Sequence, residues 1–207
     1  NTQVGYISPF LDDQRVIGDP NLLSENYGAI MVGSEWGGEH FIVAKSVAEE
    51  MLDADPSLSS VIMPMINGDE LNSSPEQTPE RYIIYFAKMA LNQAESYPKP
   101  FQLLKTQLES TAQSNRSAKP RSTWWQFRRP TVEMYSKIRQ LNRCFVIART
   151  TKYFSLSSSS TQIILSEATK VFTTDRWDLY AVVQSTVHEV WARKYSGALK
   201  QDLRYSP

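Results

Sequence analysis

The feature that most constrains the fold is the shortness of the apolar segments. The longest of them, such as residues 61–66 and 143–148, have the length of a β-strand. A helix that crosses a bilayer needs roughly 20 apolar residues, and the chain does not open with the charged and then apolar pattern of a secretory leader. We therefore expect many short elements in a protein that is neither secreted nor inserted in a membrane.

Strand-like and helix-like patterns are interspersed in the first half of the chain. Short strands are expected at 28–33 and 40–43, around the pair Gly37 and Gly38, because glycine tolerates the positive φ of a tight loop. Further strands are expected at 61–66 and 82–86. Apolar residues at helical spacing predict helices at 45–55, 88–97 and 101–113.

The second half is richer in strands. We expect a helix at 131–140 and strands at 145–149, 152–156, 161–165 and 169–172, with the serines at 157–160 as the turn of a polar hairpin over 155–162. Residues 177–195 predict one long amphipathic helix that packs across the sheet. Without a regular strand–helix–strand rhythm, the fold class is α+β, with a mainly antiparallel sheet, this C-terminal helix and a smaller N-terminal αβ lobe.

The net charge of zero hides a strong asymmetry. Residues 1–100 hold 5 Lys and Arg against 15 Asp and Glu, a balance of −10, whereas residues 101–207 hold 17 against 7, a balance of +10. We expect an acidic lobe over 1–113, a basic linker over 114–123 and a basic β-rich lobe over 124–207. The basic part suits a polyanion such as nucleic acid; alternatively, the two halves neutralise each other at an internal interface.

A search for catalytic motifs is negative. Cys144 is the only cysteine and, with His40 and His188, cannot assemble a structural zinc site. No nucleophile elbow, dinucleotide-binding glycine motif, phosphate-binding loop, Asp/Glu-x-Lys nuclease pair or Asn-Pro-Pro-aromatic cradle for a flipped base occurs. We therefore expect no catalytic centre, metal or cofactor in this chain. Cys144 is interpreted as a core thiol in a cytoplasmic protein, and His188 as a packed helix residue.

Residue types that contact nucleic acid are concentrated between residues 114 and 162. The loop 114–121 is basic and has nothing to bury, residues 124–129 interleave aromatic and basic side chains, and cations recur near 149–152. Such cations bind phosphates, while short polar side chains bond base edges. The predicted phosphate contacts are Arg116, Lys119, Arg121, Arg129 and Arg149.

Two other classes of function remain open at this point. One is a protein-interaction or regulatory module whose acidic and basic halves bind each other or a partner protein. The other is an RNA-binding domain that stacks bases on Trp124, Trp125 and Tyr153.

Six segments, which together span nearly the whole chain, resemble a known family: residues 61–72, 81–86, 125–130 (Trp-Gln-Phe-Arg-Arg-Pro), 147–153 (Ile-Ala-Arg-Thr-Thr-Lys-Tyr), 183–191 (Val-Gln-Ser-Thr-Val-His-Glu-Val-Trp) and 199–207. In this order they are similar to the target-recognition domain of MmeI-like type II restriction-modification enzymes. These enzymes are single chains that fuse endonuclease, adenine-N6 methyltransferase and DNA-reading parts. By that resemblance the chain is a fragment, with the methyltransferase motifs before residue 1 and a Phe-rich segment after its end.

The resemblance implies binding of double-stranded DNA for a methyltransferase domain of the same polypeptide, which uses S-adenosylmethionine in a bacterial or archaeal cytoplasm. It implies that residues 64–72 are scaffold, holding the acidic half against the rest of the enzyme. Base reading falls after the Trp-x-Phe-Arg-Arg-Pro segment and in the strands that follow. The corresponding residues are Gln126, Arg128, Lys152, Tyr153, Ser155, Ser157, Thr161 and Gln162.

Overall fold

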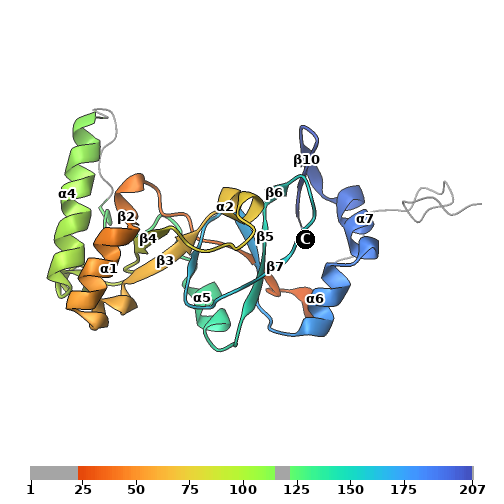
Figure 1. Cartoon of the computed structure of the whole chain (residues 1–207), viewed down its shortest axis with the longest axis horizontal. Helices are drawn as coiled ribbons and strands as arrows, with labels where there is room; N and C mark the ends of the chain where they lie inside the picture. Colours follow the sequence, from red (N-terminus) through yellow and green to blue (C-terminus); the bar gives the residue numbers. More distant parts are fainter. Residues whose placement is uncertain (1–22, 115–121, 207) are drawn as a thin grey trace, which may run out of the picture.

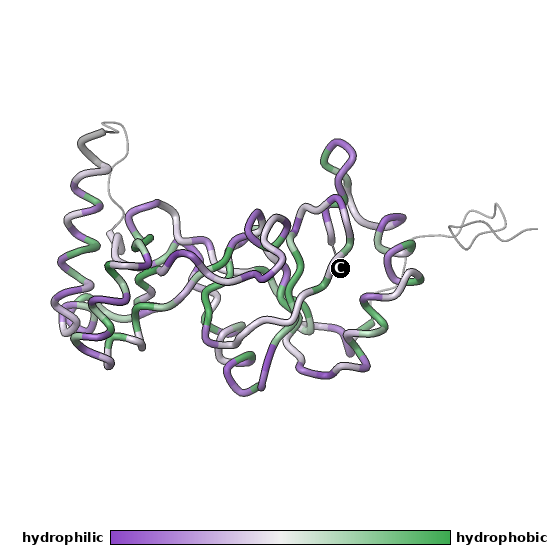
Figure 2. Tube along the Cα trace, in the orientation of Figure 1, coloured by the Kyte–Doolittle hydropathy of each residue, from purple (hydrophilic) through white to green (hydrophobic). Residues whose placement is uncertain are grey.

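The computed structural model describes residues 23–114 and 122–206. Its described part is elongated: helices α1 (Lys45–Ala54) and α4 (Pro98–Ser114) lie at one end, α6 (Trp177–Val183) and α7 (Thr186–Tyr195) at the other, and strand β5 (Cys144–Ala148) lies between them (Figure 1). Hydrophobic residues are concentrated on the central strands and hydrophilic ones on the outer loops (Figure 2). The mixed, mainly antiparallel α+β fold predicted from the sequence is confirmed.

One sheet has the order β2 (Ile42–Ala44), β4 (Arg81–Ile84), β3 (Ile62–Ile66) and β8 (Ile164–Leu165). Its first three strands are antiparallel, and β8 joins β3 in parallel, with Met65 opposite Ile164. Helix α1 follows β2 directly, and α3 (Leu91–Glu95) precedes α4. These elements lie close to the predicted ranges, because short apolar runs and helical spacing both reflect burial.

A second sheet has the order β1 (Ile30–Val32), β9 (Thr169–Phe172), β5 and β7 (Ser157–Ser159) and is antiparallel throughout. The prediction that the serines form the turn of a hairpin over 155–162 was wrong. Ser157–Ser159 form an edge strand, with Cys144 opposite Ser159 and Val146 opposite Ser157. The free edge of the buried strand β5 gives their backbone a hydrogen-bonding partner, and this tertiary context outweighs the weak strand propensity of serine.

The third sheet consists of β10 (Gly197–Leu199), β11 (Asp202–Arg204) and β6 (Thr150–Thr151). The strand predicted at 152–156 is absent: residues 152–156 are irregular and follow β6, and the strand predicted at 161–165 is reduced to β8. Phe154 and Leu156 are nevertheless buried. Their apolar spacing therefore reflects packing into the core without strand pairing.

The single long helix predicted at 177–195 was also wrong. It is divided into α6 and α7 at Gln184 and Ser185. The Ser185 side chain accepts a hydrogen bond from the His188 amide and caps α7, and the Gln184 amide side chain binds the backbone of Phe154 and Leu156. Capping by serine stabilises a new helix start, so these contacts favour the break.

The two helices cover the second sheet only in part. Tyr180, Val183 and Ala192 pack against the core around Phe145 and Ile147. The large apolar side chains Trp177, Val182, Val187 and Trp191 remain about half exposed or more. The expected apolar stripe is thus shared between the core and the surface.

Strands from the two halves of the chain are interleaved. β1 pairs with β9 and β3 with β8. Ser34, which follows β1, is completely buried; its Oγ lies 2.6 Å from Thr131 Oγ1, and its amide donates to Leu165 O. A Cβ at Gly33 would lie 2.1 Å from Ser166 O, so only glycine fits there. The boundary predicted between the acidic lobe 1–113 and the basic lobe 124–207 therefore does not coincide with a boundary between the sheets.

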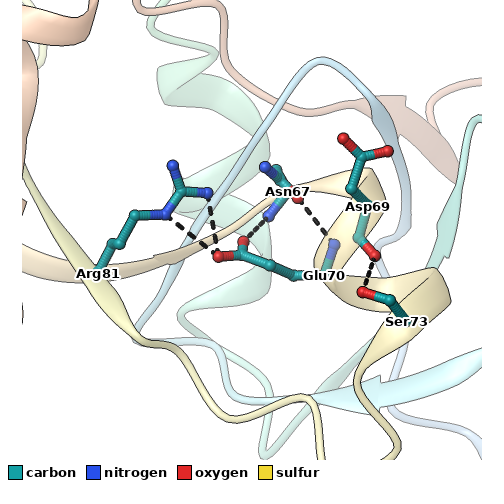
Figure 3. Close-up of polar contacts among 5 residues, drawn as sticks. All are labelled: Asn67, Asp69, Glu70, Ser73 and Arg81. Atoms are coloured by element: carbon teal, nitrogen blue, oxygen red, sulfur yellow. Dashed lines mark hydrogen bonds and ion pairs between the residues drawn. The ribbon is translucent and has the colours of Figure 1, made fainter.

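A capping box fixes the start of helix α2 (Gly68–Ser73) (Figure 3). The Asn67 side chain accepts from the Glu70 amide at 2.8 Å, and the Glu70 carboxylate accepts from the Asn67 amide at 2.7 Å. Glu70 also binds the guanidinium of Arg81, 3.0 Å away on β4. The segment 64–72 is thus tied at its helix start to the neighbouring strand.

Candidate nucleic-acid interface

The predicted contact residues that the structure describes fall in three places. Gln126, Arg128 and Arg129 lie in the segment that contacts the loop after β1. Ser155, Ser157, Thr161 and Gln162 lie around strand β7, and Arg149, Lys152 and Tyr153 lie around β6. The predicted phosphate contacts Arg116, Lys119 and Arg121 lie outside the described residues.

In the segment with Gln126, Arg128 and Arg129, several polar groups already form hydrogen bonds or ion pairs within the protein. The Gln126 side chain donates to Met89 O at 2.8 Å, as does the indole of Trp125 at 2.9 Å. The guanidinium of Arg128 binds Glu35 at 2.8 Å, although the Arg128 side chain is 61% exposed. The backbones of Arg129 and Glu35 bind each other through both amides. Of these side chains, those of Arg128 and Arg129 are exposed, so an incoming ligand could recruit them.

At the second place, β7 borders a cleft of about 480 Å³. Ser158, Ser159, Ser160 and Gln162 line one part of it, and Gln77, Thr78 and Tyr82 line another. The Ser157 hydroxyl accepts from Gln77 Nε2 at 2.6 Å. Thr161 is buried, whereas Ser155 and Gln162 are exposed. Exposed polar groups beside a cleft are available to form hydrogen bonds with a bound molecule.

The loop that carries Gln77 has an unusual backbone. Gln77 has φ +51°, in the left-handed region that non-glycine residues rarely adopt. Its amide binds the Ser74 hydroxyl, and its side chain reaches Leu71 O and Ser157. These bonds stabilise a strained conformation that holds the loop against β7.

The third place presents its side chains most openly. Tyr153 is 71% exposed, with Lys152 Nζ 5.2 Å from its ring centroid. The backbone beneath them is fixed, because Thr151 Oγ1 donates to Tyr153 O and Arg193 donates to Lys152 O. An exposed ring and an exposed cation on a fixed loop are suited to contact with a phosphate and a base.

Sequence reasoning missed two cations near Arg149: Lys170 on β9 and Arg204 on β11. The pKa of Lys170 is lowered, first by burial and then by the positive charges of Arg149 and Arg204. Strand pairing, which the sequence does not reveal, brings these three residues together. The only local signal was a lysine within the otherwise apolar and β-branched strand Thr169–Phe172.

His188 is packed, as the sequence predicts. Its Nε2 lies 3.0 Å from the Tyr205 hydroxyl, its ring contacts Phe154, and burial lowers its pKa. Cys144 is likewise buried, and burial raises the pKa of its thiol to about 12.

Within residues 23–114 and 122–206, no three His, Cys, Asp or Glu side chains gather as a metal site would require. No helix in this part of the chain is long and apolar enough to span a bilayer.

Comparison with known proteins gives one family and one fold. The model of the family described as "MmeI, target recognition domain" matches residues 17–207. A solved structure described as "Structure of Type IIL restriction-modification enzyme MmeI in complex with DNA has implications for engineering of new specificities" is similar with a TM-score of 0.65 and 16% identity. The match covers 98% of this chain and 27% of that one, so this chain spans about a quarter of that protein's length. No curated protein matches.

Proposed function

The chain belongs to the family of MmeI target recognition domains, and on that premise we propose that it binds double-stranded DNA and recognises a sequence in it for a larger restriction-modification enzyme. The observation that carries the proposal is the family match over residues 17–207. The open, basic surface around β6 supports it, because Arg149, Lys152 and Tyr153 are of the types that contact phosphates and bases.

Within this function we assign the phosphate contacts to Arg129 and Arg149 and, in the basic loop, to Arg116, Lys119 and Arg121. Base reading is assigned to Gln126, Arg128, Lys152, Tyr153, Ser155, Ser157, Thr161 and Gln162. Exposure favours five members of this set, Arg128, Lys152, Tyr153, Ser155 and Gln162. Ser157 and Gln126 would have to exchange the protein hydrogen bonds they make for bonds to DNA. Thr161 is buried in the free protein and would have to become exposed to reach a base.

The parent enzyme of this proposal is an adenine-N6 DNA methyltransferase of a bacterial or archaeal cytoplasm. Its methyltransferase domain would lie in the same polypeptide and contact the acidic residues of 1–113. S-adenosylmethionine would supply the methyl group. We assign its site to that domain, because this sequence lacks the Asn-Pro-Pro-aromatic cradle for a flipped base. The role of this chain is to hold the DNA in register.

The test is binding of this chain to labelled random duplex DNA, single-stranded DNA and duplex RNA, measured by fluorescence anisotropy. Release of counterions predicts that duplex DNA affinity falls by orders of magnitude between about 50 and about 200 mM salt if six or more phosphates are contacted. Stronger binding to duplex RNA or to single strands would favour the RNA-binding alternative. Absence of duplex binding at low salt would contradict the proposal.

A further inference from the structure

We propose that Arg149, Lys170 and Arg204 together form a binding site for one backbone phosphate of the DNA, an inference that rests on the proposed function. Only Arg149 was expected to contact phosphate. The site would combine two guanidiniums, which match phosphate oxygens in a planar fork, with one ammonium that acts as a compact charge.

Strand register brings the three residues together. Lys170 on β9 lies opposite Ile147 on β5. Arg149 is two residues beyond Ile147 and its amide still binds Ala168 O at 2.7 Å, so the ladder continues to it. Side chains two residues apart share a face, and diagonal neighbours on paired strands lie about 7–8 Å apart. Lys170 and Arg149 are therefore diagonal neighbours on one face.

Arg204 joins them through the third sheet. It lies opposite Thr150, and the next residue, Tyr205, donates its amide to Arg149 O at 2.9 Å. Leu203 and Tyr205 are buried on either side of it, while Arg204 is exposed. The buried neighbours fix the backbone position of Arg204 beside Arg149 and leave its side chain open to solvent.

Within residues 23–114 and 122–206, these three positive charges have no acidic partner. Several other cations of the described chain, such as Arg81, Arg128 and Arg193, form ion pairs with carboxylates. Among the residues that the structure describes, none of Arg149, Lys170 and Arg204 forms one, either with the nearby Glu167 and Asp202 or with another acid.

A half-buried lysine beside two guanidiniums is unfavourable in the free protein. Burial and like charge both disfavour its protonated form, in agreement with the direction of its pKa. An anion bound between the three groups would attract all three charges and so favour the protonated form of Lys170. A DNA phosphate is the anion we favour, because Arg149 leads within a few residues to the exposed Lys152 and Tyr153.

The test compares Lys170→Met and Arg204→Gln in this chain with the matched control Lys105→Gln, which removes one exposed positive charge from α4. With random duplex DNA, each site variant should bind about tenfold more weakly at about 100 mM salt, and the slope of log affinity against log salt should fall by about one. The control should bind within about twofold of the original chain. Lys170→Arg, which keeps the charge, should restore the slope even where Lys170→Met unfolds part of the protein.

A direct readout is reductive methylation of lysines followed by mass spectrometry. Duplex DNA should protect Lys170 and leave Lys105 reactive. If the original chain binds DNA while the site variants keep its affinity and salt slope, the phosphate site is refuted and the proposed function stands. If Lys170 is methylated as readily in the DNA complex as in the free chain, the phosphate site is likewise refuted. The three cations would then be expected to bind an acidic surface of the parent enzyme. If the original chain binds no duplex DNA, the proposed function itself fails.

Discussion

The guanidinium of Arg128 lies 2.8 Å from a carboxylate oxygen of Glu35. Glu35 is fixed in this position because its backbone amide and carbonyl both bind Arg129. One of the proposed base-reading side chains is therefore already paired with an acid in the free protein, and DNA must compete with that acid for it.

Replacing Glu35 by Gln should strengthen binding to duplex DNA several-fold at low salt, because it frees Arg128 and removes a negative charge that repels phosphate. The control is Glu133→Gln, which breaks the exposed pair with Lys137 on α5 and should change affinity less. Anisotropy titrations of both variants provide the measurement. Equal effects would mean that only net charge matters and that Arg128 does not reach the DNA.

Changing Gln162, exposed beside the β7 cleft, should alter specificity more than general affinity. In the full-length enzyme, Gln162→Glu should cost roughly 1–3 kcal/mol on the original site and relax or change one base position, since it replaces donors by acceptors. Sequencing of methylated sites across a genome measures this. Gln102→Glu, on exposed α4, serves as the control. A uniform loss of methylation with an unchanged recognised sequence would assign Gln162 to the scaffold.

Removing the Tyr135 hydroxyl should destabilise the fold. This buried hydroxyl accepts from the Leu165 amide and from Ser34 Oγ, and burial raises its pKa to about 12. Tyr135→Phe leaves a buried amide without that partner, which costs about 1–3 kcal/mol. Urea unfolding should show a lower midpoint with an unchanged slope. Tyr82→Phe, at a half-buried position on β4, should have a smaller effect, and the reverse order would contradict the assignment.

The capping box of α2 should contribute about 1 kcal/mol of stability. Asn67→Ala removes the acceptor for the Glu70 amide (Figure 3). Ser73→Ala is the control, because the exposed Ser73 hydroxyl only donates to Asp69 O within the same helix. If both variants unfold at the same urea concentration as the original chain, the box is not what fixes the segment.

The free energy of unfolding should fall as the solution becomes acidic. Burial lowers the pKa of both His40 and His188, so the folded state disfavours the protonated rings. Unfolded histidine binds a proton near its ordinary pKa of about 6.5. The stability from these two residues is therefore complete above that pH and is lost as pH falls through the lower folded values. A variant with both changed to Gln should show a flatter dependence of unfolding between about pH 8 and about pH 5, and parallel curves would refute the assignment.

The sequence predicted the elements whose burial is visible in local spacing. β5 is buried along its whole length and was expected as a strand, and α1 was expected from its helical spacing. The edge strand of serines was missed, because it depends on a partner that is distant along the chain. The break after α6 was missed because the apolar stripe continues across Ser185, and only the bonds of Gln184 to the Phe154–Leu156 backbone reveal the anchor.

The candidate site could likewise be predicted only where its residues are close together in the sequence. Arg149, Lys152 and Tyr153 are close together in the sequence and could be grouped from it. Lys170 and Arg204 reach Arg149 through strand pairs that the sequence does not specify. Conversely, residue type alone could not show that the amide of Gln126 is bound to Met89.

The interleaved strands have a consequence for synthesis and for engineering. When the ribosome has made β1 and β3, their partners β9 and β8 are still untranslated, so the first half emerges with exposed apolar strand edges and long-range contacts that form late. A cut anywhere between residues 115 and 121 would separate β1 from β9 and β3 from β8, so neither piece would contain all the strands of its sheets. A chimera that exchanges recognition between relatives must therefore transplant the domain as a single cassette, or change individual surface residues within it.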